Sequence, residues 1–179
     1  MQAWCAMFMR KCLLLSLVVA LPVSAELGGD LRPALGKPAP ADFESVVMPD
    51  GAGLPAGQGS VAAGEEIYAF RCAACHGADG RLAGNQLVGG EGTLASARPL
   101  KTVGSYWPYA TTLFDYVGRA MPYGDEKSLT VTERYSVVAY VLHLNGIVGA
   151  DETLDQDSLP KVEMPNREGF FEAQDFASD

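Results

Sequence analysis

The sequence predicts an all-α domain over residues 60–148, because it holds three helix patterns and no clear run of alternating polar and apolar residues between them. Ser60 is a candidate N-cap for a first helix that runs to about Cys75. A Gly-rich loop follows over residues 77–92, where no helix is expected. A shorter middle helix is expected from about 109 to 119, with apolar residues at helical spacing.

The last helix of this domain has the clearest start signal. Thr130 and Glu133 have the spacing of a capping box, in which each side chain bonds to the backbone of the other residue. The helix should end near Gly146, since glycine accepts the left-handed backbone that follows many helices. Its apolar positions recur at helical spacing at Val137, Val138, Val141 and Leu144, with Tyr140 among them.

Extended arms are predicted on both sides of the domain. Residues 26–59 are interrupted by five prolines and end in a cluster of glycines, so no helix of useful length fits there. Residues 149–179 form an acidic extension that also contains Leu154, Leu159, Met164 and Phe170. These apolar residues favour an extension that wraps the domain or joins a partner over a disordered, solvated tail.

Residues 1–25 have the pattern of a secretory signal peptide. Arg10 and Lys11 precede a short apolar stretch, and small residues end at Ala25, so the mature chain is expected to start at Glu26 in a bacterial periplasm. The alternative is an uncleaved anchor, although the apolar stretch is short for a membrane span. Cleavage would leave two cysteines and no span in the mature chain.

The charge balance restricts the partners that the chain can bind. Thirteen basic and 22 acidic residues give a formal net charge of −9. This excess of negative charge argues against nucleic acid or anionic lipid as a partner. It is compatible with a partner that has a positive docking face, and equally with a general role in solubility.

The chemistry is concentrated in five consecutive residues, Cys72-Ala73-Ala74-Cys75-His76. This spacing is typical of covalent attachment of one haem c, with both thiols bonded to the porphyrin and the histidine on iron. A thioredoxin-type centre would need a βαβ context, which is not visible here. A zinc site would need a second pair of ligands, which the sequence does not offer.

His76 is the predicted proximal iron ligand, and its second ring nitrogen should donate to a carbonyl in the loop from Leu82 to Gly89. Met121, just after the middle helix and before a proline, is the predicted distal ligand. The rival ligands are Met48, Met164 and His143. Trp107 and Tyr106 are predicted to wall the haem or to bond its propionates, which Arg98 and Lys101 could neutralise; ordinary core and surface roles are the alternative.

Residues 60–148 resemble class I cytochrome c. The resemblance implies that Gly64 lets the first and last helices cross closely and that the aromatic Tyr68 packs at the crossing. It also implies that Val137 and Tyr140 are the partners of these residues in the last helix.

A narrower resemblance covers residues 53–60, 103–116, 120–122, 139–147 and 164–167. These segments are similar to the haem subunit of periplasmic sulfite dehydrogenases and to the cytochrome subunit of sulfur dehydrogenase in bacterial thiosulfate oxidation. The resemblance implies a molybdenum-cofactor subunit as partner and Met121 as iron ligand. The sulfur dehydrogenase cytochrome commonly carries two haems, whereas this chain has one attachment motif.

These features predict an electron-transfer protein or subunit rather than an enzyme. Electrons would come one at a time from the molybdenum partner and leave to another cytochrome or an oxidase. The alternatives are a general periplasmic electron shuttle unrelated to sulfur, a structural subunit whose extensions matter most, and a ligand-binding or catalytic haem protein with an open iron site.

Overall fold

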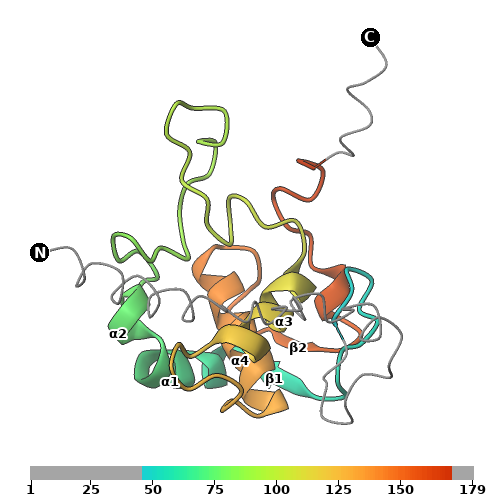
Figure 1. Ribbon diagram of the computed structural model, residues 1–179. Coiled ribbons are helices and arrows are strands. Elements are labelled where there is room, and N and C mark those ends of the chain that lie inside the picture. Colours follow the sequence, from blue (N-terminus) through green and yellow to red (C-terminus); the bar gives the residue numbers. More distant parts are fainter. Residues whose placement is uncertain (1–45, 171–179) are drawn as a thin grey trace, which may run out of the picture. The chain divides into compact units, whose positions relative to one another are not determined.

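The computed structural model of the chain describes residues 46–170. The predicted signal peptide, most of the N-terminal arm and residues 171–179 lie outside the described residues. Figure 1 shows helices packed around α4 and a two-stranded sheet. The elements are β1 (Gln58–Ser60), α1 (Val61–Arg71), α2 (Ala73–His76), α3 (Ala110–Ala120), α4 (Val131–Leu144), β2 (Thr153–Asp155) and the 3-10 helix η2 (Leu159–Lys161). None of the described helices is long and apolar enough to cross a membrane.

The packing of α1 against α4 depends on Gly64. A Cβ atom at Gly64 would overlap the backbone carbonyl of Ser136 on α4 and would lie 2.8 Å from the Cβ of Tyr140. A glycine is therefore required for the two helix backbones to approach this closely. One turn further along α1, the ring of Tyr68 packs against that of Tyr140 with 5.2 Å between centroids. The crossing expected from the resemblance is confirmed.

Two of the three predicted helices begin where the sequence placed them, and the third begins one residue later. The Ser60 side chain accepts from the N–H of Ala63 and caps α1. Thr130 and Glu133 form the predicted capping box at the start of α4. The middle helix, α3, spans Ala110–Ala120, one residue later at each end than predicted.

The prediction of one continuous first helix to Cys75 is wrong. α1 ends at Arg71, and Cys72 has φ −123° and ψ −37°, outside helical geometry. The separate single turn α2 follows and ends before Gly77, whose φ of 82° favours glycine. Cys72 thus lies at the break between the two helices, and Cys75 lies within α2.

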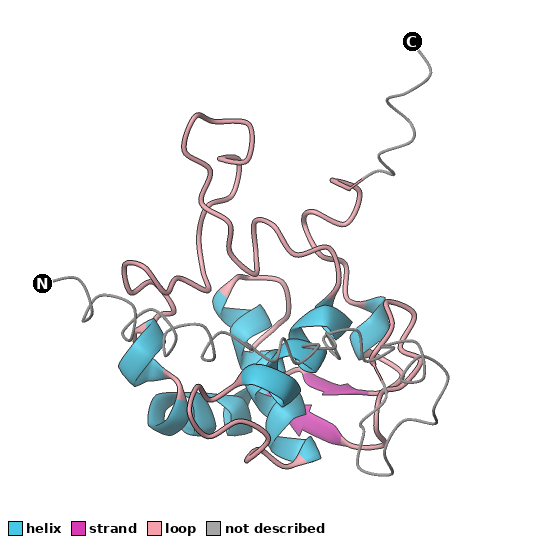
Figure 2. Ribbon diagram, in the orientation of Figure 1, coloured by secondary structure: helices cyan, strands magenta, loops and turns pink. Residues whose placement is uncertain are grey.

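A short antiparallel sheet was not predicted. β1 and β2 pair in the register Gln58 with Asp155, Gly59 with Leu154 and Ser60 with Thr153 (Figure 2). Each strand has three residues, too few for the alternation that identifies a strand in a sequence. The sheet joins the end of the N-terminal arm to the start of the C-terminal extension, so the described domain is mainly rather than wholly helical.

The described part of the C-terminal extension packs on the helices. Leu154, Leu159 and Met164 are buried in the same core as the helices. In the described part of the N-terminal arm, Val47 donates its N–H to the carboxylate of Asp115 on α3 at 3.2 Å. Apolar residues of both flanking segments thus complete the core rather than stand apart from it.

The close crossing gives a first prediction, for Gly64→Ala. Alanine in a helix interior normally stabilises by about 0.5–1 kcal/mol relative to glycine. Here the added methyl overlaps a backbone carbonyl that cannot rotate away, which costs about 1–3 kcal/mol or more. The net expectation is a loss of roughly 2 kcal/mol in denaturant unfolding.

Gly149→Ala is the control, because a Cβ there meets no atom closer than 3.7 Å. This control should stay within about 0.5 kcal/mol of the parent protein. Equal stability of the Gly64 and Gly149 variants would contradict the close crossing.

A second prediction concerns Tyr135 on α4, whose hydroxyl donates to the Pro55 carbonyl at 2.9 Å. Burial, and then the nearby Asp155 and Asp157 carboxylates, raise the pKa of Tyr135 to about 12. Tyrosine in the unfolded chain ionises near pH 10. The stabilisation that Tyr135 gives the folded state through its raised pKa is therefore complete below pH 10, and it is lost as the pH rises from about 10 to 12. Tyr135→Phe should reduce this alkaline loss of unfolding free energy by on the order of 2 kcal/mol.

Tyr123→Phe is the matched control, since the Tyr123 side chain is 89% exposed. It should keep the pH dependence of the parent protein in denaturant unfolding from pH 9 to 12. The same alkaline loss in Tyr135→Phe as in the parent would rule out this role of Tyr135.

Candidate functional site

A cavity of about 380 Å³ lies between α1, α2, α3 and α4. The cysteine–histidine motif lies on one part of its wall, and the loop after α3 lies on another. Leu113, Val117, Val137 and Val141 line it from α3 and α4, with Val103 and Leu129 from the loops. The lining is thus mostly apolar, with a few polar groups at defined places, as expected for a cofactor site.

The attachment motif places both thiols at this cavity. Cys72 is half-buried and Cys75 is exposed, on either side of the start of α2. Burial raises the pKa of the Cys72 thiol to about 11, an effect that Arg71 opposes and Cys75 adds to. The free Cys72 thiol is therefore neutral at pH 7, unlike the low-pKa thiolates of redox-exchange sites. Among the described residues, no group of three His, Cys, Asp or Glu side chains could hold a metal ion.

The orientation of the His76 ring is set by a backbone carbonyl. His76 Nδ1 lies 2.7 Å from the carbonyl oxygen of Asn85. A carbonyl only accepts, so Nδ1 carries the hydrogen and the lone pair of neutral imidazole is on Nε2. The predicted acceptor in the loop 82–89 is confirmed, at Asn85. The loop returns to the histidine because Leu82 donates its N–H to the His76 carbonyl at 3.0 Å.

Met121 is the methionine that the fold brings to the cavity. It follows the last residue of α3, and its N–H donates to the Val117 carbonyl at 3.2 Å. The rival ligands lie elsewhere among the described residues. Met48 is 50% exposed and Met164 is buried in the core, and neither lines the cavity. His143 also lies outside the lining, with its Nδ1 3.1 Å from the Val148 carbonyl.

Of the two predicted aromatic residues, one reaches the cavity. Trp107 lines it and packs edge-on against Tyr116, with 5.6 Å between centroids. Tyr106 is not part of the lining: its ring packs against Phe170 at 5.2 Å, and Lys101 lies over it at 4.8 Å. The structure therefore gives Tyr106 and Lys101 a contact with each other, away from the lining.

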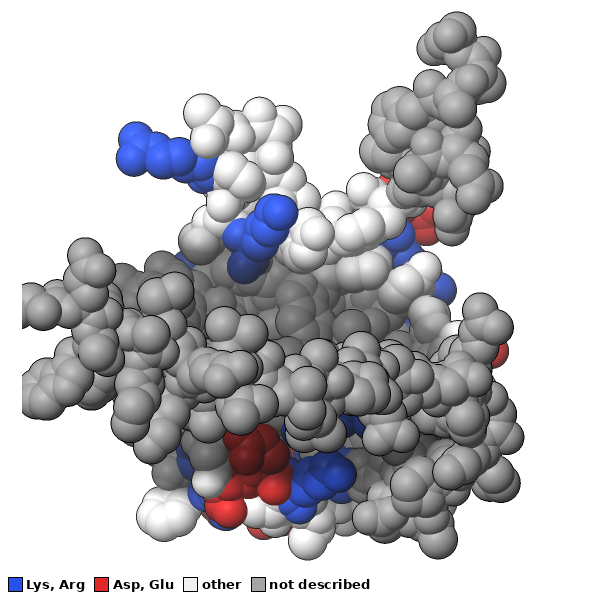
Figure 3. All heavy atoms as spheres, in the orientation of Figure 1, with Lys and Arg blue, Asp and Glu red and all other residues white. Residues whose placement is uncertain are grey.

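Arg98 also lies outside the lining, on a loop that projects from the helices over residues 89–102 (Figure 1). Bonds from Thr102 Oγ1 to the Gly89 carbonyl and from Ser105 Oγ to the Leu100 carbonyl close the base of this loop. Figure 3 shows basic side chains on this projection, and acidic and basic side chains next to each other below the grey atoms. The described charges on this face are thus mixed rather than of one sign.

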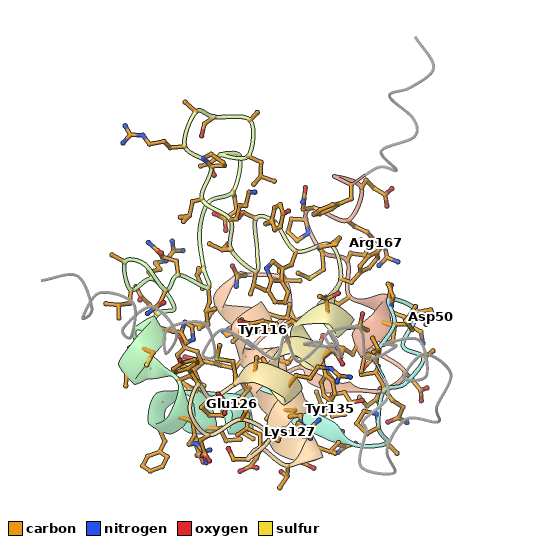
Figure 4. All side chains as sticks on the ribbon, viewed as in Figure 1. Asp50, Tyr116, Glu126, Lys127, Tyr135 and Arg167 are labelled. Carbon is orange, nitrogen blue, oxygen red and sulfur yellow. The ribbon has the colours of Figure 1, made fainter. Side chains whose placement is uncertain are left out.

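Several lining residues were missed by sequence reasoning. Tyr116, labelled in Figure 4, and Tyr123 line the cavity although they are 47% and 89% exposed. Asn85 acts through its backbone, so its residue type gave no signal. Arg71 also lines the cavity, and its position directly before Cys72 was the available signal.

Comparison with known proteins agrees with this geometry. The model of the family described as cytochrome c matches residues 61–145. A solved structure, the sulfane dehydrogenase SoxCD from Paracoccus pantotrophus, is 40% identical to this chain, with a TM-score of 0.73. The match covers 80% of this chain and 74% of that chain. No curated protein sequence matches the chain.

Proposed function

The chain belongs to the cytochrome c family, and we propose that it is a periplasmic haem subunit. It would take single electrons from a molybdenum-dependent sulfite or sulfur dehydrogenase and pass them to the respiratory chain. Membership of the family makes the chain an electron-transfer cytochrome with covalently bound haem c. The presence of Cys72, Cys75, His76 and Met121 around one cavity carries the haem site of the proposal, and the similarity to SoxCD carries the choice of electron donor.

The residues around the cavity fit a haem held in this way. Cys72 and Cys75 would form the two thioether bonds, and the lone pair on His76 Nε2 would be the proximal ligand. The Met121 thioether would be the distal ligand, a soft donor that favours ferrous iron. When bound, the haem supplies a one-electron couple between ferric and ferrous iron.

The protein's part in electron transfer is to fix the ligands and exclude water. The carbonyl of Asn85 holds the His76 ring through Nδ1–H, which fixes the tautomer and raises the basicity of the ligand. Leu113, Val137 and Val141 keep the cavity apolar, which limits solvent access and tunes the potential. We propose that the chain itself performs no chemistry on the sulfur substrate.

The similarity to SoxCD supports the choice of electron donor. That protein is a sulfane dehydrogenase, and 40% identity over 80% of this chain extends beyond the cytochrome c match at residues 61–145. The described C-terminal extension is part of the packed domain through Leu159 and Met164. A dehydrogenase subunit with a molybdenum cofactor is therefore the proposed partner, and the leader at residues 1–25 would direct the chain to the periplasm.

A general periplasmic electron shuttle is the second candidate function, since the same site would serve any electron donor. An open-iron haem protein is less favoured, because Met121 lines the cavity and His143 bonds to Val148 outside it. Slow binding of carbon monoxide to the ferrous protein is expected if Met121 holds the sixth position.

Met121→Ala tests the distal ligand. The variant should lose the sulfur-to-iron charge-transfer absorption of the ferric protein. Its potential should fall by on the order of 0.1 V, well within the roughly 0.8 V range that axial ligands set. Absorption spectra and a redox titration measure both effects.

Met48→Ala is the control, because the Met48 side chain is 50% exposed and away from the cavity. This variant should keep both the absorption band and the potential. Loss of the band in Met48→Ala, with the band kept in Met121→Ala, would exchange the two assignments.

The electron donor can be identified by optical mixing. Oxidised, haem-loaded protein is mixed with periplasmic extract from its own source, sulfite or thiosulfate is added separately, and haem reduction is followed. We expect reduction that depends on a molybdenum protein in the extract, with extract depleted of that protein as control. Reduction by neither substrate would remove the sulfur dehydrogenase from the proposal and leave the general shuttle.

A further inference from the structure

Met121 lies at the start of a mostly exposed loop. This Met121 loop, residues 121–129, joins α3 to α4. Leu129 at its end is buried, whereas residues 123–128 are exposed. The bonds within the loop are local, such as the Asp125 N–H to the Pro122 carbonyl at 3.0 Å and the Gly124 N–H to Glu126 Oε1 at 2.8 Å.

One side chain of α1 reaches across to this loop. Arg71 Nη2 donates to Asp125 Oδ2 at 2.7 Å and to Ser128 Oγ at 2.5 Å. At the two ends of the loop, the Met121 N–H donates to the Val117 carbonyl on α3 at 3.2 Å, and Arg134 Nε on α4 donates to the Leu129 carbonyl at 3.2 Å. Figure 4 labels Glu126 and Lys127, which lie between these two anchor points in sequence.

The position of Arg71 makes this contact relevant to the iron ligand. Arg71 is the last residue of α1 and directly precedes Cys72, so its backbone belongs to the segment that is fixed by the covalent haem. Its side chain also lines the cavity, as Met121 does. The Arg71 side chain is 28% exposed and that of Asp125 is 66% exposed, so the pair lies at the surface and contributes up to about 1 kcal/mol.

We propose that Arg71 is a positioning residue that fastens the Met121 loop to the haem-attachment segment and thereby keeps the Met121 sulfur on the iron. This inference rests on the proposed function, in which Met121 is the distal ligand. Movement of the loop would carry the Met121 sulfur away from the iron, and that movement would stretch or break the contacts of Asp125 and Ser128 with α1. Arg71 therefore lowers the population of the open-iron form without touching the iron.

The measurement is carbon monoxide binding to the haem-loaded ferrous protein at neutral pH, since carbon monoxide replaces the sulfur after it has left and no electrons are transferred. Arg71→Gln should accelerate binding about fivefold, the factor that corresponds to a strong exposed charged pair. It should also weaken the sulfur-to-iron band of the ferric protein. Arg71→Lys, which keeps a positive donor, should restore most of the parent rate.

Asp125→Asn tests the same contact from the other side and leaves the cavity lining intact, in case Arg71→Gln attaches haem poorly. The double variant should bind carbon monoxide no faster than the faster single variant, because both changes break one contact. Lys127→Gln is the matched control: it removes a positive charge from the same loop, and Lys127 is exposed. This control should keep the parent rate.

The possible failures can be told apart. If Met121→Ala lacks the sulfur-to-iron band while Arg71→Gln and Asp125→Asn bind carbon monoxide at the parent rate, the ligand stands and the positioning role of Arg71 is overturned. If Met121→Ala keeps the band, the distal ligand itself is wrong and this inference falls with it. If Lys127→Gln accelerates carbon monoxide binding as much as Arg71→Gln does, the loss of any positive charge near the loop would explain the effect. That result would also overturn the proposal.

Discussion

The close approach of α1 and α4 at Gly64 is the contact on which the haem site depends. α1 leads into Cys72 and His76, and α4 supplies Val137 and Val141 to the lining of the same cavity. A larger residue at Gly64 would push the helix backbones apart, because the atom that blocks it is the Ser136 carbonyl. The width of the cavity is thus set by a contact outside it.

The site divides its tasks between covalent and non-covalent groups. In the proposed site, the two thiols would hold the haem in the cavity, whereas the iron ligands would need to be oriented. His76 is oriented by the Asn85 carbonyl at 2.7 Å, and Met121 belongs to a loop that Arg71 ties to α1. Neither orienting group would itself bond to the iron, and each would restrict a proposed ligand whose side chain could otherwise turn away.

The flanking segments belong to the folded domain where the structure describes them. Gln58 to Ser60 pair with Thr153 to Asp155, and Leu159 and Met164 fill the core beside the helices. Small cytochrome domains bury limited apolar area, so added segments contribute stability that the helices and cofactor alone would otherwise have to supply. The similarity to the sulfane dehydrogenase likewise extends beyond the cytochrome c match at residues 61–145, because it covers 80% of the chain.

The sequence by itself determined the attachment residues and the starts of α1 and α4, because covalent haem attachment and helix capping both use residues within five positions of each other. The tertiary structure decided which methionine reaches the cavity, which carbonyl holds His76, and that Arg71 meets Asp125 54 residues away. It also placed Tyr106 against Phe170 instead of the cavity. These contacts depend on the paths of loops, and a backbone carbonyl such as that of Asn85 has no side-chain signature that a sequence pattern could reveal.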